Sequence, residues 1–115
     1  MSTSTFNPTS RIGVKFTANV GRNKLIGFDG ALCGAGAVAL GVTEYAYNSG
    51  DEGSVITGQT ALLTIKAALS AGDFIASDVN GDGVLAVAGD VVNGILLKDC
   101  EENDEAEVLL STFQI

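Results

Sequence analysis

The residues best suited to chemistry form one short turn, 78–83, with the sequence Asp-Val-Asn-Gly-Asp-Gly. Oxygen-bearing side chains stand at its first, third and fifth positions and glycine stands at the sixth, as in the first half of a calcium-binding loop. The second half departs from that pattern, because position 12, where a bidentate glutamate completes the ligands, is Gly89. The flanking residues alternate with period two, which is typical of strands and not of the helices that border such a loop. We therefore expect a hairpin turn at Asp78, Asn80 and Asp82, and no metal site.

No other combination of residues predicts catalysis. The chain has no histidine, so a serine or cysteine nucleophile would lack the side chain most often used as its base. The glycine-rich stretch 27–41 lacks the Gly-Lys-Ser/Thr ending of a phosphate-binding loop. The acidic run 99–105 is typical of a solvated loop. We expect no catalytic residues, no cofactor and no enzymatic activity.

Two cysteines, Cys33 and Cys100, are too few for a disulfide framework, and no Cys-x-x-Cys motif or Cys/His cluster indicates zinc. Both lie in or beside apolar segments. We expect buried free thiols, and a disulfide between them is the alternative.

The turn 78–83 and the two cysteines are expected to lie among short strands separated by tight turns. Glycine and aspartate are turn formers, and apolar runs end at Gly-Asp four times. These steps are Gly50-Asp51, Gly72-Asp73, Gly81-Asp82 and Gly89-Asp90. The pattern predicts an all-β fold, a small barrel or sandwich of about eight to ten short strands. Residues 1–11 are expected to form a flexible N-terminal arm on a single β domain, 12–115.

Alternation of apolar and polar residues places the strands. A hairpin is expected from 74–77 with 84–87, and a strand over 91–98 is expected to carry a bulge at Gly94. Further strands are expected over 12–16, 38–43, 54–57 and 108–113. Segment 61–70 can be a helix, but the β-branched Thr64 and Ile65 favour a strand over 61–65. At most one short helix is then expected, a single turn near residues 66–71.

The charges are unevenly placed. The first 28 residues carry Arg11, Lys15, Arg22 and Lys24 and no acidic residue, while the rest carries two lysines and fourteen acids (2 − 14 = −12), for a net charge of −8. An acidic body of this kind repels phosphate, so no nucleic-acid partner is expected. The four basic residues fit either a solvated face or contacts with an acidic partner or a neighbouring subunit.

Targeting signals are not apparent either. The N-terminal residues have no basic region followed by an apolar run, as a signal peptide would. The weakly polar stretch 31–42 is too short to span a bilayer. We expect synthesis in a cytoplasm and no membrane partner.

From residue 37 onward, the order and spacing of these motifs resembles the small capsid cement (head decoration) proteins of tailed phages. The segments that carry the resemblance are 38–43, Gly50-Asp51, Gly58, 71–78, the turn to Gly83, 89–99 and the terminal strand. The resemblance implies a β-rich homotrimer that binds the major capsid protein on the outer surface of an icosahedral head and stabilises it. It implies no catalysis and no cofactor. The segments that carry the resemblance do not include the four basic residues of the first 28; as a separate hypothesis, Arg11, Lys15, Arg22 and Lys24 are expected to face the capsid or a neighbouring protomer.

Two other classes of protein fit the same residues. One is a β-sandwich adhesion module that binds carbohydrate or depends on calcium through Asp78, Asn80 and Asp82, although few aromatic residues are present to stack on sugars. The other is a different virion part, such as a tail or fibre module.

Overall fold

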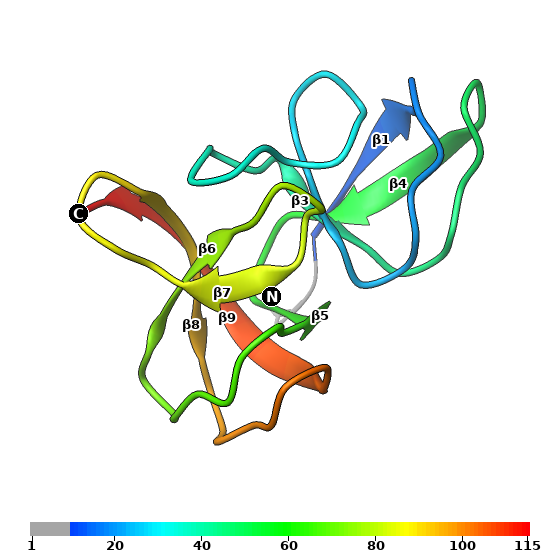
Figure 1. Cartoon of the computed structure of the whole chain (residues 1–115). Coiled ribbons are helices and arrows are strands. Elements are labelled where there is room, and N and C mark those ends of the chain that lie inside the picture. The colour runs from blue at the N-terminus through cyan, green and yellow to red at the C-terminus, as the bar shows by residue number, and fades with distance from the viewer. Residues whose placement is uncertain (1–9) are drawn as a thin grey trace, which may run out of the picture.

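The computed structural model describes residues 10–115, and in this part of the chain it contains nine strands and no helix (Figure 1). The all-β class predicted from the sequence is therefore confirmed. Between residues 10 and 115 there is accordingly no helix long and apolar enough to cross a membrane.

The strands form two antiparallel sheets, one from each half of the chain, that pack as a small sandwich. The first half contributes β1 (Arg11–Lys15), β2 (Leu25–Ile26), β3 (Gly41–Thr43) and β4 (Glu52–Ile56). The second half contributes β5 (Thr60–Thr64), β6 (Phe74–Ser77), β7 (Gly83–Leu85), β8 (Val91–Leu96) and β9 (Glu105–Gln114). The strand order is β1-β4-β3-β2 in the first sheet and β5-β9-β8-β6-β7 in the second. Figure 1 shows β1, β3 and β4 on one side of the molecule and β6 to β9 on the other.

The main core lies between the two sheets. In the second sheet, Ala61 lies opposite Val108 and Val108 lies opposite Leu96, and all three side chains are buried. They join Val42 and Ile56 of the first sheet in one cluster of buried apolar residues. Burial of these side chains from both sheets is the main favourable contribution that holds the sheets together.

A smaller cluster covers the other face of the first sheet. Val55 precedes Ile56 on β4, so its side chain points to the opposite face. There it packs with buried Phe16, Val20 and Ile26. The ring of Phe16 stacks on that of Tyr47, with the ring centroids 4.4 Å apart.

Four turns share one pattern of hydrogen bonds. In each, the fourth residue is an aspartate whose N–H donates to the C=O of the first residue and whose carboxylate accepts the N–H of that same residue. The third residue has a positive φ, which favours glycine or asparagine. The turns are 48–51, 70–73, 87–90 and 101–104. Each aspartate directly precedes a strand, so the four turns start β4, β6, β8 and β9.

Most predicted strands are present. The hairpin of β6 and β7 is confirmed, and so is the bulge, because the register between β8 and β9 shifts between Val92 and Gly94. The strand predicted over 38–43 is confined to β3, because residues 27–40 form a long connection that bonds to both sheets. Gly36 in this connection donates to Ser77 and accepts from Val91. The N-terminal arm lies almost wholly outside the described residues, and Arg11 is the first residue of β1.

The helical turn predicted over residues 66–71 is wrong. The backbone of residues 66–69 bonds to distant residues, and Ser70 begins the turn 70–73. The N–H of Lys66 donates to Gly83, and Leu69 pairs with Cys100 in an isolated bridge. These contacts satisfy the polar groups that a helical turn would otherwise pair locally.

Gly81 and Gly89 provide a matched test of this packing. Both have a positive φ, but a Cβ on Gly81 would lie 2.6 Å from the carbonyl oxygen of Leu25, whereas one on Gly89 would meet nothing within 4 Å. We expect Gly89→Ala to lower the free energy of unfolding by about 1–2 kcal/mol, the cost of the left-handed backbone. Gly81→Ala should cost about 2 kcal/mol more, because the hydrogen bond from Leu25 to Gly81 must also be displaced. Urea unfolding of both variants measures the difference, and equal losses would contradict this account.

Candidate interaction surfaces

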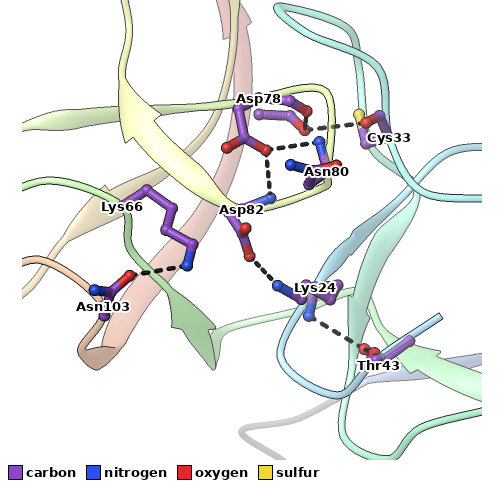
Figure 2. Close-up of polar contacts among 10 residues, drawn as sticks. Lys24, Cys33, Thr43, Lys66, Asp78, Asn80, Asp82 and Asn103 are labelled. Atoms are coloured by element: carbon purple, nitrogen blue, oxygen red, sulfur yellow. Dashed lines mark hydrogen bonds and ion pairs between the residues drawn. The ribbon is translucent and has the colours of Figure 1, made fainter.

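Lys24, one of the four basic residues singled out by the sequence, lies at the junction of the two sheets (Figure 2). It directly precedes β2, and its ammonium group forms an ion pair with the carboxylate of Asp82, in the turn between β6 and β7. The side chain of Lys24 is 24% exposed and that of Asp82 only 3%. Lys24 is therefore committed to a partner inside its own chain.

Backbone hydrogen bonds join the sheets at the same place. The buried Asn23 has φ of 59°, and its carbonyl accepts the N–H of Thr64 on β5. The N–H of Leu25 donates to the carbonyl of Gly81 at 2.7 Å. Within the first sheet, the hydroxyl of the buried Thr43 accepts the N–H of Lys24 and donates to the carbonyl of Gly21. We call residues 23–25 with their partners Thr64, Gly81 and Asp82 the inter-sheet junction.

Arg11 and Arg22 form ion pairs at the surface. Arg11 donates to Glu44 at 2.6 Å, and Arg22 lies 3.3 Å from Glu105. All four side chains in these pairs are more than a third exposed, so each pair contributes little to stability. The two arginines therefore remain reachable by an acidic partner that competes for them.

Lys15 is the remaining basic residue of the group. It is exposed at the end of β1, opposite Glu52 on β4, and forms no ion pair with any residue from 10 to 115. Arg11 and Lys15 share β1, an edge strand of the first sheet. Arg22 and Lys24 lie in the connection between β1 and β2. The structure thus brings together two of the four residues, and their predicted contact with a partner stays a prediction.

The turn 78–83 is held by contacts within the chain (Figure 2). Oδ1 of Asp78 accepts the N–H groups of Asn80 and Asp82 at 2.8 and 2.9 Å, and the carboxylate of Asp82 is paired with Lys24. Among residues 10–115, no group of three or more His, Cys, Asp or Glu side chains is placed to hold a metal ion. The geometry therefore accounts for the oxygen-bearing residues as a hairpin turn and as part of the inter-sheet junction.

The second sheet exposes apolar side chains on its outer surface, which the sequence analysis did not identify. Four neighbouring leucine and phenylalanine side chains there are between 38% and 50% exposed: Leu62, Phe74, Leu97 and Leu109. Adjacent leucines at 62–63, 96–97 and 109–110 were the available signal. Successive side chains of a strand point to opposite faces, so one leucine of each pair must face away from the core.

Cys33 and Cys100 are both buried and free, as predicted. Burial raises the pKa of the Cys33 thiol, because the charged thiolate is disfavoured away from water. Its sulfur also donates to the carbonyl of Ala37 at 3.4 Å.

The inter-sheet junction can be tested with Lys24→Met. The change leaves the buried carboxylate of Asp82 without its partner, so the free energy of unfolding should fall by about 3 kcal/mol. The matched control Arg22→Met breaks an exposed pair and should cost less than about 1 kcal/mol. Asp82→Asn on top of Lys24→Met should recover part of the loss, because it removes the unpaired charge. Equal losses in the two single variants, measured by urea unfolding, would refute the structural role of Lys24.

The Cys33 thiol should resist alkylation. At pH 8 we expect iodoacetamide to modify it at least about tenfold more slowly than an unfolded cysteine, because little thiolate is present. The pKa is higher in the folded than in the unfolded chain, so stability should fall as pH rises above the ordinary value for a thiol. A Cys33→Ala variant should lack this contribution to the pH dependence. Fast alkylation of Cys33 in the folded protein, located by mass spectrometry, would contradict its burial.

The fold of this chain is similar to that of a known protein, although its sequence matches no known family. No family model and no curated protein matches the sequence. Among solved structures, the chain is similar to the head fiber gp8.5 N base in bacteriophage phi29, with a TM-score of 0.75. The match covers 93% of this chain and 98% of that chain at 15% sequence identity. At this identity the match establishes a shared fold.

Proposed function

We propose that this chain is a structural protein of a tailed-phage virion that binds the phage head. The observation that carries the proposal is the fold likeness to a phage head fiber base, which extends over nearly the whole of both chains. The resemblance of residues 37–115 to capsid cement proteins supports the same location from a separate feature, the order of the turn motifs.

In its finer form, the proposal is a decoration, or cement, protein. A homotrimer binds major capsid protein subunits on the outer surface of the head and bridges them. Binding to the assembled shell but not to free subunits shifts the assembly equilibrium toward the intact head. Contacts made by several copies at once strengthen attachment without any single strong contact. The role requires no catalysis, cofactor, nucleic acid or membrane.

The capsid-facing surface in this proposal is β1 and its surroundings. Lys15 is available there, and Arg11 can exchange Glu44 for an acidic group on the capsid. Arg22 contributes at the periphery through its exposed pair with Glu105. Lys24 acts indirectly, because its ion pair with Asp82 maintains the sheet arrangement that presents β1.

A second candidate is a head-bound base that carries a longer fibre. The specific observation in its favour is that the similar solved structure is described as the base of a head fiber. Both candidates bind the head. They differ in whether the protein bridges capsid subunits or attaches a fibre to them.

Sedimentation of the purified protein with mature, empty heads tests the proposal. The protein should co-sediment at a fixed saturating ratio to the major capsid protein. Lys15→Glu should reduce affinity about two- to fivefold at low salt, with a smaller effect at high salt because charges are then screened. The matched control is Lys98→Glu, the same charge change in the loop after β8, and it should bind like the parent chain. Absence of any binding would sink the proposal, and a large fall in Tm on adding EDTA would favour the calcium-dependent adhesion module.

A further inference from the structure

We propose that the outer apolar face of the second sheet is buried against the first-sheet half of a neighbouring copy of this chain, in a head-to-tail contact. The face consists of Leu62, Phe74, Ile95, Leu97, Leu109 and Phe113. The inference rests on the proposed function in one respect, namely that the protein acts as an oligomer.

The register of the strands places these side chains together. Phe74 on β6 lies opposite Ile95 on β8, which lies opposite Leu109 on β9. Opposite residues in neighbouring antiparallel strands share a face, so these three form one row. The ring of Phe113 meets that of Phe74 edge to face, with the centroids 5.1 Å apart.

A second row continues the apolar surface toward β5. Leu62 lies opposite Glu107 on β9, and Leu97 donates its N–H to the carbonyl of Glu107 from the other side. Glu107 is two residues from Leu109, so both rows belong to the same face. The two rows span four neighbouring strands of the second sheet. The exposed Glu107 interrupts the second row, but a cluster of exposed apolar side chains on one face of a small domain still indicates a contact surface.

The distribution of charge identifies the occupant and its orientation. Residues 57–115 carry two lysines and ten acids (2 − 10 = −8), so this half holds the entire net charge. Residues 1–56 carry four basic and four acidic residues (4 − 4 = 0). Two copies meeting face to face would oppose −8 with −8 and bring their Glu107 side chains toward each other. A copy that presents its neutral half avoids this repulsion.

The neutral half also offers apolar surface of its own. Ile12, Phe28, Val38 and Tyr45 are each more than 40% exposed. The head-to-tail arrangement therefore covers apolar surface on both copies. Contacts between two different surfaces of the same chain close into a ring when the rotation between copies permits, which is the symmetry of the homotrimer proposed above.

The experiment measures the mass of the full chain in solution by sedimentation equilibrium, without heads. The parent chain should be oligomeric, and Leu109→Glu, in the middle of the face, should shift it to monomer at the same concentration. Leu62→Glu should do the same and serves if Leu109→Glu fails to fold, as judged by circular dichroism. The matched control is Val79→Glu, an equally drastic change at a 70% exposed turn position, and it should retain the parent mass. A monomeric parent at tens of micromolar, or a folded face variant of unchanged mass, would overturn the proposal.

A cysteine at the face distinguishes the two orientations. In a head-to-tail contact, Leu109→Cys on one copy is far from the same residue on the next, so mild oxidation should give no linked dimer beyond that of the parent chain. A disulfide-linked Leu109→Cys dimer would establish the face-to-face contact and overturn the head-to-tail one. Failure of this inference can be distinguished from failure of head binding. A monomeric parent that still co-sediments with heads would refute the inference and the homotrimer, and would leave the proposed binding to the head standing.

Discussion

The relative position of the two sheets depends on the ion pair between Lys24 and the buried carboxylate of Asp82, and on the backbone bonds around it. The two sheets come from separate halves of the chain, and β-strand pairing within each sheet does nothing to set their relative position. The apolar core favours contact but is non-directional. The inter-sheet junction supplies direction, because the ammonium group, the positive φ of Asn23 and the Leu25 to Gly81 bond each require one geometry. The desolvation of the Asp82 carboxylate offsets much of the attraction between the two charges, so the intact pair adds little net stability.

Charged side chains also stabilise the turns through contacts within the chain. In three of the Gly-Asp steps and in the Asn103-Asp104 step, the aspartate carboxylate accepts a backbone N–H of its own turn. Four acids that stand out in the sequence therefore stabilise turns. Asp78 and Asp82 are similarly engaged. An acidic sequence of this kind resembles a metal-binding protein until the backbone partners of its carboxylates are known. Exposed groups remain on β1, where Lys15 has no ion pair within residues 10–115, and on the outer face of the second sheet, where Leu62 and Phe74 are exposed.

Local features of the sequence predicted local structure well. The hairpin around residue 80, the bulge at Gly94 and the burial of both thiols each depend on a few neighbouring residues. Features set by distant residues were not predictable from pattern. The segment after β5 is not helical because Gly83 and Cys100 bond its backbone, and nothing near Lys66 in the sequence signals that. The basic residues looked like one group, yet Arg22 pairs with Glu105, 83 positions later, and Lys24 with Asp82. The apolar outer face was visible as paired leucines, but only the register shows that Leu109 and Phe74 share a row with Ile95.

The central place of β9 has a consequence for how the protein is made. β9 pairs with β5 on one side and with β8 on the other, although β5 to β8 all leave the ribosome first. The first sheet uses only residues 11–56 and can form during synthesis. The second sheet is completed only when residues 105–114 have emerged, because β9 alone joins β5 to β8. Until then its Val, Leu and Ile side chains stay uncovered, and such late, non-local pairing is slow and prone to aggregation. Aggregation of the newly made chain therefore competes most strongly with folding during this interval.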